Sequence, residues 1–317
     1  MNKNYRYNFA LIGLAGYIAP RHLEAIKKNN CNLKCSLDIN DSVGFVEKYF
    51  PNSYFFTEIG RFDRYIDKIS RTKDKINFIT ICSPNYLHDS HIRLGLRSKS
   101  HVICEKPLVI NPWNLDAIEK MQREYKKKVY SINQLRLHPS IVKLKNKINK
   151  SKKIYDVEIT YITPRGNWYK YSWKGDENKS GGILYNIGIH LFDLINFLFG
   201  KIDDSKVNFA SENCYSGVIR AKRANIRYFL SIDKNHLNYI NKKNLVNPVK
   251  ILKVDGINID LSKNFDNLHT LSYKKILDKK GFQINSVRSG IELTYLIKKS
   301  KISSPNLDSH PLLRKIR

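Results

Sequence analysis

The fold of this chain is indicated by two apolar runs that each end in a polar turn: INFITICSPNYLH, residues 76–88, and HVICEKP, residues 101–107. Short β-branched runs that stop at proline or asparagine are typical of strands buried in a parallel sheet. Ligands bind at the carboxyl edge of such open sheets, so both turns are expected there. The segment Glu105-Lys106-Pro107 is then either a solvated turn or a lysine held at a cofactor crevice.

A glycine turn precedes these two runs. Gly13 and Gly16 follow a predicted strand, Tyr7–Ile12, and open a predicted helix through Tyr17 and Ile18. Strand, glycine turn and helix form the setting of a dinucleotide fingerprint, in which the helix N-terminus holds a pyrophosphate. One extra residue between the glycines departs from the G-x-G-x-x-G spacing, so the turn alone is a weak signal.

The next predicted strand, residues 33–37, ends at Asp38, about 20 residues after the glycines. A carboxylate in this position accepts a hydrogen bond from a ribose 2′-hydroxyl and repels a 2′-phosphate, so Asp38 favours NAD over NADP. Taken by itself, Asp38 is equally well explained as a cap for residues 39–42.

Repeated strand–helix units continue to about residue 140 and imply α/β structure, a doubly wound parallel sheet of Rossmann type. Beyond that point one apolar helix, Ile183–Phe199, is followed by alternating strands that predict a mainly antiparallel open sheet. We therefore expect a dinucleotide-binding domain over residues 1–140 and an α+β domain over 141–317. A final helix around residues 289–299 can pack back on the first domain.

Composition excludes several classes of protein. The chain has 317 residues, of which 42% are hydrophobic and 26% charged, as in a folded protein of two domains. No apolar stretch approaches the roughly 20 residues that cross a bilayer, and the first residues lack the apolar core of a secretory signal. The five cysteines are odd in number and lack metal-ligand spacing, so we expect reduced thiols, a cytoplasmic protein and no metal site.

The net charge of +28 suggests an acidic partner. The basic residues are scattered, however, and no nucleic-acid-binding motif is present. A compositional bias combined with anionic ligands is therefore favoured over nucleic-acid binding.

These motifs occur in the order that is typical of the Gfo/Idh/MocA oxidoreductases. The glycine turn, Ser-Pro-Asn-x-Leu-His and Glu-Lys-Pro are followed by Gly181-Gly182-x-x-x-Asn186-x-Gly188-x-His190-x-x-Asp193. The segments 16–22, 133–139, 163–169 and 172–175 resemble more narrowly the family's UDP-N-acetylglucosaminuronate 3-dehydrogenases, which act in bacterial surface-polysaccharide synthesis. The resemblance extends from about Tyr7 to at least Leu296. It implies NAD-dependent oxidation of the sugar 3-hydroxyl to a 3-keto sugar.

The resemblance also implies roles for individual residues. Lys106 and His190 are the expected catalytic pair, and Asn186 replaces the aspartate that the family usually has four residues before the histidine. The i, i+4 spacing puts Asn186 and His190 on one helix face, and asparagine cannot take a proton. His190 is favoured as the base because imidazole ordinarily titrates near a pH of about 6.5, although burial of Lys106 would allow the roles to be exchanged.

The remaining implied residues fall into two groups. Substrate-binding residues are Asn186, Arg165, Tyr169 and Gln134; cofactor-binding residues are Gly13, Gly16, Tyr17, Ile18, Asp38, Ser83, Pro84, Asn85, His88, Glu105, Lys106 and Trp168. His190 as a satisfied core histidine, Trp168 as a core aromatic and Asp193 as a structural residue remain alternatives.

Other functions stay open on the sequence. The same chemistry on another nucleotide sugar, a free sugar or inositol is one alternative, and a non-catalytic nucleotide-sensing protein is another. The expected partners are a UDP-sugar acid and further copies of the chain, as a dimer or tetramer through the second-domain sheet, with no nucleic acid and no membrane. The sequence does not reveal how NADH is reoxidised.

Overall fold

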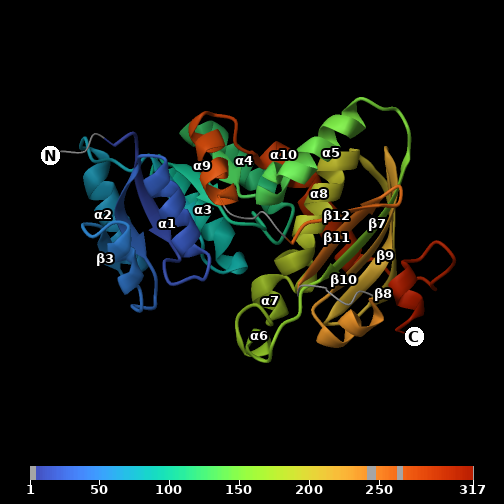
Figure 1. Ribbon diagram of the computed structural model, residues 1–317. Helices are drawn as coiled ribbons and strands as arrows, with labels where there is room; N and C mark the ends of the chain where they lie inside the picture. The colour runs from blue at the N-terminus through green and yellow to red at the C-terminus, as the bar shows by residue number, and fades with distance from the viewer. Residues whose placement is uncertain (1–4, 241–247, 263–266, 317) are drawn as a thin grey trace. The chain divides into compact units, whose positions relative to one another are not determined.

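The computed structural model describes residues 5–240, 248–262 and 267–316 (Figure 1). The chain divides into two compact units, and each unit contains a six-stranded sheet. Unit 1 consists of residues 1–134 and 266–288, and unit 2 of residues 135–265 and 289–317. The predicted fold class, a Rossmann sheet followed by an α+β domain, is confirmed.

The sheet of unit 1 is parallel, and its strand order β3-β2-β1-β4-β5-β6 is that of a Rossmann fold. Its strands are β1 (Asn8–Ile12), β2 (Asn32–Leu37), β3 (Tyr54–Phe56), β4 (Phe78–Ile81), β5 (His101–Cys104) and β6 (Val129–Ser131). The connecting helices are α1 (Ala19–Lys28), α2 (Ile59–Ser70), α3 (His88–Arg97) and α4 (Asn114–Tyr125). The central strands are buried on both faces, which explains their unbroken apolar runs.

A helix from late in the chain completes unit 1. Helix α9 (Leu268–Leu277) packs against α1 and β1, and its residues Tyr273 and Ile276 share a core cluster with Phe9 and Leu23. The helix that we expected to return to the first domain, residues 289–299, is instead the end of α10 (Ile284–Lys299), and those residues belong to unit 2.

Unit 2 contains a mixed sheet in the order β12-β11-β7-β10-β9-β8. Its strands are β7 (Tyr155–Ile162), β8 (Ile202–Ala210), β9 (Cys214–Ala221), β10 (Ala224–Ser231), β11 (Val249–Val254) and β12 (Ile257–Asp260). Among the described strands of this sheet, β7 and β10 pair in parallel, and the other strand pairs are antiparallel. The mainly antiparallel sheet that the alternating runs predicted is therefore present.

Helix α8 (Ile189–Phe199) covers one face of this sheet. The ring of Phe192 lies 5.5 Å from that of Tyr228 in β10, and Phe199 lies 6.2 Å from Tyr155 in β7. Because side chains alternate along a strand, the next residue, Phe229, packs on the opposite face. Besides α8 and the end of α10, unit 2 contains the helices α5 (Pro139–Asn149), α6 (Trp168–Tyr171) and α7 (Glu177–Ser180).

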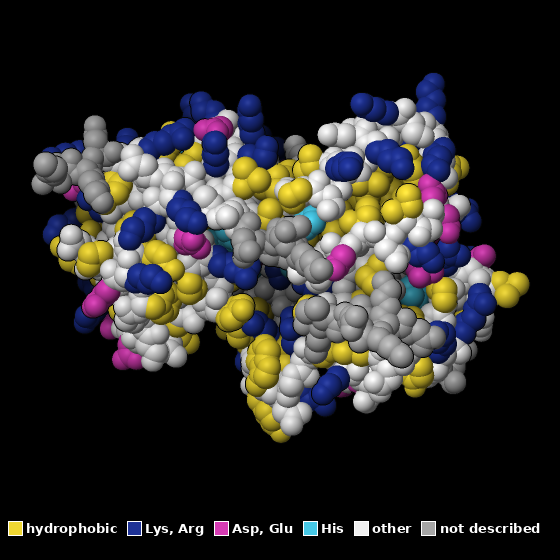
Figure 2. Space-filling model, in the orientation of Figure 1, with side chains coloured by type: hydrophobic (Ala, Val, Ile, Leu, Met, Phe, Trp, Pro, Cys, Tyr) yellow, Lys and Arg dark blue, Asp and Glu magenta, His cyan; other side chains and the backbone are white. Residues whose placement is uncertain are grey.

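Two general features of the chain bear on its setting. One helical stretch, Glu177–Phe199, has the length and apolar composition of a membrane span, but 72% of its most apolar window is buried in the fold, as in the core helix of a folded domain. All five cysteines are free and buried. Figure 2 shows Lys and Arg side chains spread over the visible face rather than gathered in one stripe.

Candidate active site

The glycine turn lies against the end of β4. Gly13 has a φ of +90°, and a Cβ added there would lie 2.5 Å from the backbone nitrogen of Ser83. Any other residue would therefore be strained and would also clash with backbone, so the turn requires glycine at this position. The turn continues through Gly16 and the exposed Tyr17 to Ile18, the N-cap of α1. Glycine in such a turn lets the backbone approach a dinucleotide pyrophosphate, and the start of α1 offers the N–H groups of a helix N-terminus.

Asp38 holds the other side of this turn. Its Oδ2 accepts a hydrogen bond from the backbone N–H of Ala15 at 2.8 Å, and its Oδ1 accepts one from Asn40 at 2.9 Å. The second bond closes a local turn, but no helix begins at residues 39–42, so the expected helix cap is not formed. The first bond ties the carboxylate to the glycine turn, where binding of a ribose would need it. Each oxygen retains capacity for a further donor.

His88 joins the two polar turns at the carboxyl edge of the sheet. Its Nε2 lies 2.9 Å from the carbonyl oxygen of Ser83, and its Nδ1 lies 2.6 Å from that of Pro107, after the cis peptide Lys106-Pro107. The ring is fully buried, and burial lowers the pKa of His88 while these two contacts oppose the shift. A neutral imidazole carries one N–H, so both contacts are full hydrogen bonds only when the ring is protonated.

The neighbours of His88 in the first turn are also ordered by hydrogen bonds. The hydroxyl of Ser83 lies 2.9 Å from Nδ1 of His91, a residue whose pKa burial lowers to about 4. Asn85 is buried and Pro84 is half-buried. The predicted cofactor-binding residues of this turn thus lie together in unit 1.

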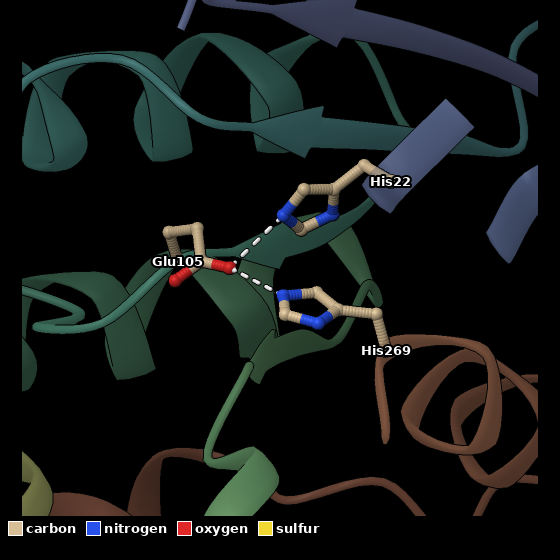
Figure 3. A group of neighbouring side chains, drawn as sticks. All are labelled: His22, Glu105 and His269. Carbon is tan, nitrogen blue, oxygen red and sulfur yellow. Dashed lines mark hydrogen bonds and ion pairs between the residues drawn. The ribbon is translucent and has the colours of Figure 1, made fainter. Parts of the chain in front are cut away.

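Glu105 is the centre of a cluster that the sequence did not predict. Nε2 of His22 and Nε2 of His269 lie 2.9 and 3.1 Å from the same carboxylate oxygen, Oε1 (Figure 3). The other oxygen, Oε2, accepts the backbone N–H of Lys106 at 3.2 Å. Two imidazoles and one carboxylate whose ligand atoms lie within 4.8 Å of one another are also a set that zinc accepts. His22 is part of the segment that carried the family resemblance, but nothing in the sequence connected it to His269.

Two buried side-chain oxygens follow β6. Oδ1 of Asn133 and Oε1 of Gln134 have no hydrogen-bond partner in the described part of the chain. Buried polar atoms are nearly always satisfied, so these two oxygens point to a ligand or an ordered water. They are the observation that best fits a bound cofactor or substrate in unit 1.

A second group of predicted residues lies together in unit 2. The side-chain amide of Asn186 donates to the Tyr169 hydroxyl at 3.0 Å and lies 3.4 Å from the carbonyl oxygen of Lys174. The Lys174 ammonium lies over the ring of Trp168, 5.3 Å from its centroid. Burial and the nearby charge of Arg165 lower the pKa of Lys174.

Positive charge is therefore concentrated in this group. Arg165 is exposed, and within the described residues it makes no ion pair with a carboxylate. A cationic, polar site of this kind suits an anionic ligand. Lys174 was quoted in the family resemblance but was not among the predicted site residues; in the structure its ammonium contacts the rings of both Trp168 and Trp173.

The helix that carries His190 is not a regular α-helix. Leu184–Gly188, which contains Asn186, is a π-helix and leads into α8. Single π-helical turns are rare and are frequently found at functional sites. Asn186 and His190 are both half-buried between neighbours that are buried, so they share the more open side of the helix as their spacing predicted.

Asp193, one turn after His190, forms a buried ion pair with Arg136. Arg136 Nε and Nη2 donate to Oδ2 and Oδ1 at 2.8 and 2.5 Å, and the two side chains are 3% and 5% exposed. This geometry supports the structural reading of Asp193.

Comparison with known proteins agrees with these features. The model of the oxidoreductase family with an NAD-binding Rossmann fold, Gfo/Idh/MocA, matches residues 7–133, and its C-terminal alpha/beta domain matches residues 145–234. The chain belongs to the Gfo/Idh/MocA oxidoreductase family. As a member of it, the chain is similar over 96% of its length to the WlbA (WbpB) dehydrogenase from Thermus thermophilus, at 38% identity and a TM-score of 0.91.

That structure contains NAD and alpha-ketoglutarate, and the match covers 99% of it. A second structure of the Thermus enzyme, with NAD and UDP-GlcNAcA, matches with a TM-score of 0.90 at the same identity and coverage. Among curated relatives, inositol 2-dehydrogenase of Rhizobium meliloti is 28% identical over 61% of this chain and 55% of its own length. Glucose-6-phosphate 3-dehydrogenase of Bacillus subtilis is 25% identical over 58% of this chain and 52% of that enzyme.

Proposed function

We propose that this protein oxidises the 3-hydroxyl of UDP-N-acetylglucosaminuronic acid to a 3-keto sugar, with NAD as the hydride acceptor. The observation that carries the proposal is the 38% identity, over nearly the whole of both chains, with a dehydrogenase crystallised with NAD and UDP-GlcNAcA. The product would enter bacterial surface-polysaccharide synthesis, such as that of O-antigen in lipopolysaccharide, in the cytoplasm. Copies of the chain would associate through the sheet of unit 2.

Unit 1 supplies the residues that would hold the cofactor. The glycine turn and the start of α1 would bind the pyrophosphate, and Asp38 would accept a hydrogen bond from the ribose. When bound, NAD supplies the nicotinamide carbon that receives the hydride. The buried oxygens of Asn133 and Gln134 are acceptors available to the cofactor's amide or to the sugar.

Unit 2 supplies the residues that would hold the charged sugar nucleotide. Arg165 and Lys174 suit its carboxylate or phosphates, and Asn186, oriented by Tyr169, suits a sugar hydroxyl. Trp168 offers a ring face to the cofactor or to uridine. These assignments combine the roles that the family resemblance implies with the contacts described above.

The chemistry needs one group that accepts the hydroxyl proton and another that orients this hydroxyl and stabilises the developing alkoxide. We assign the first role to His190 and the second to Lys106. Removing a general base typically lowers the rate on the order of 100- to 10,000-fold. Lys106→Met and His190→Asn should each lower the rate of hydride transfer by a factor in that range, while the folded protein still binds NAD.

The test is to incubate the protein with NAD and a panel of nucleotide sugars, free sugars and inositol while reduced nicotinamide is followed. Enzyme is used in substrate-like amounts, so that a single turnover is seen even if the cofactor is retained. Lys120→Met, an exposed lysine of α4, is the matched control and should keep the parent rate. Oxidation of another sugar in preference to UDP-N-acetylglucosaminuronic acid would transfer the proposal to that substrate, and no oxidation of any sugar would favour a nucleotide-sensing protein. Adding 2-oxoglutarate tests it as the acceptor that reoxidises NADH.

A further inference from the structure

The cluster around Glu105 has a hydrogen-bond order that can be assigned completely. Nδ1 of His22 lies 2.8 Å from the Tyr273 hydroxyl, which lies 2.8 Å from the hydroxyl of Thr80. Nε2 of His22 and Nε2 of His269 both face Oε1 of Glu105. All five residues are buried, with at most 7% of any of them exposed.

The charge state of Glu105 fixes the direction of each bond. Burial by itself would raise the pKa of this carboxyl, but the hydrogen bonds from the two histidines outweigh it and hold the pKa well below its usual range. An ionised carboxylate only accepts, so each imidazole donates its Nε2 proton to it. Burial lowers the pKa of His22, which leaves that ring neutral and makes its Nδ1 an acceptor.

The tyrosine and the threonine complete the chain of donors. Tyr273 has one hydroxyl proton and donates it to Nδ1 of His22, so Thr80 must donate to Tyr273. The order is therefore Thr80 to Tyr273 to His22 to Glu105, with His269 donating from the other side. Both sequences of donors therefore end at the Glu105 carboxylate.

This carboxylate also holds the turn that carries Lys106. Its second oxygen accepts the Lys106 backbone N–H, and the carbonyl of the following Pro107 is contacted by His88. Burying a carboxylate lowers the stability of the fold unless the carboxylate is paired and hydrogen-bonded. Packing of α1 and α9 against β5 would not by itself need a buried charge. The charge is located where it holds the main chain on the N-terminal side of the Lys106 Cα, and His88 holds the carbonyl that follows.

We propose that Glu105, held by His22 and His269, is a positioning residue that fixes the backbone at Lys106 and thereby the place of its ammonium group. This inference rests on the proposed catalytic role of Lys106 for its effect on rate, but not for its effect on the backbone. None of the three residues needs to touch the substrate. A misplacement of about 1 Å in a reacting group can cost roughly 100-fold in rate, so loosening this turn should lower hydride transfer by about that factor.

The experiment compares two substitutions of one residue. His269→Gln keeps an amide N–H near the position of Nε2, whereas His269→Leu fills similar space without a donor. Three quantities are measured in the full chain: the single-turnover rate of nicotinamide reduction, the Kd for NAD, and the exchange rate of the Lys106 amide proton by NMR. Val102→Ala, a fully buried residue in the middle of β5, is the control for lost stability alone.

We expect His269→Leu and Glu105→Gln to speed exchange of the Lys106 amide and to slow hydride transfer, with little change in the Kd for NAD. His269→Gln should keep the exchange rate of the Lys106 amide and the rate of hydride transfer close to those of the parent. Val102→Ala should change neither rate. Parent-like exchange at Lys106 in His269→Leu and Glu105→Gln would overturn the proposal, as would equal losses in His269→Gln and His269→Leu.

The remaining outcomes separate this inference from the proposed function. If the parent protein oxidises no sugar, the proposed function fails, and amide exchange still decides whether the cluster fixes the backbone. A metal ion found in stoichiometric amount by elemental analysis, and lost in His269→Leu, would make the three side chains ligands and would overturn the hydrogen-bonded arrangement.

Discussion

Replacing Asp193 with asparagine would test whether this residue of the family motif is structural. The substitution keeps the shape of the side chain but removes the negative charge that pairs with the buried Arg136 guanidinium. Breaking a buried ion pair by removing one partner costs about 3–5 kcal/mol of folding free energy. Arg136→Met should cost a similar amount, because it leaves the carboxylate buried alone.

The double variant separates the pair from its surroundings. Replacing a buried ion pair by apolar residues of similar volume is often neutral or stabilising by about 1–4 kcal/mol. Arg136→Met with Asp193→Leu should therefore lose far less stability than Arg136→Met and Asp193→Leu, made as single variants, lose together. The difference is the coupling energy of the pair, which should be large because both carboxylate oxygens are bonded at 2.8 and 2.5 Å.

Urea unfolding followed by tryptophan fluorescence measures this cycle. Trp168 and Trp173 lie in unit 2 with the ion pair, and a Trp113→Phe background removes the signal of unit 1. A loss of about 3–5 kcal/mol in the free energy of unfolding lowers the midpoint of the urea transition by about 2 M when that free energy falls by about 2 kcal/mol per M urea. Additive losses in the double variant would refute the pairing argument. A stable Asp193→Asn protein that transfers no hydride would show instead that Asp193 has a catalytic role.

Three further outcomes are expected. Asp38→Ala should weaken NAD binding about 10- to 100-fold and narrow the gap to NADP in a fluorescence titration, because a hydrogen bond to a charged group is lost; equal affinities of the parent for both cofactors would contradict the assignment. Arg165→Lys should raise the KM for the sugar nucleotide about 10-fold and leave the Kd for NAD unchanged, whereas weakened NAD binding would place Arg165 at a cofactor, including one in a neighbouring subunit. Stability should fall as the pH drops below about 6.5, because burial lowers the pKa of His91 to about 4 and of His310 to about 3, so the unfolded chain takes up protons first. At pH 5 each histidine should lower the free energy of unfolding by roughly 2 kcal/mol relative to its value at pH 7.5. A urea midpoint that does not move between pH 7.5 and 5 would contradict this expectation.

Local patterns predicted most of the fold. The run of residues 76–81 contains β4 because β-branched residues suit a strand buried on both faces. Strand β3 was missed because Tyr54–Phe56 has only three residues, too few to show a period. Motif order placed the glycine turn, Asp38 and Ser83 in one unit because parallel strands end at one edge of a sheet.

The rest depended on contacts between distant parts of the chain. His22 and Glu105 are 83 residues apart, and His269 and Glu105 are 164 apart, so no spacing rule connects them. Helix α9 joins unit 1 through Tyr273 and its neighbours, which are buried against α1 and β1, and this is a tertiary choice that an amphipathic pattern does not specify. The π-helical turn at Asn186 has no sequence signal of its own.

The hydrogen-bond partners of three carboxylates in the motifs bear on the choice of catalytic base. Asp38 accepts two backbone N–H groups, Glu105 accepts two imidazoles and the Lys106 amide, and Asp193 is bound on both oxygens by a guanidinium. Of these, the hydrogen bonds from His22 and His269 hold the pKa of Glu105 well below its usual range, which makes this carboxylate a weak base. The position where the family usually has another aspartate is an asparagine here. Asparagine cannot take a proton, which favours the proposed assignment of the proton transfer to the nitrogen groups of His190 and Lys106.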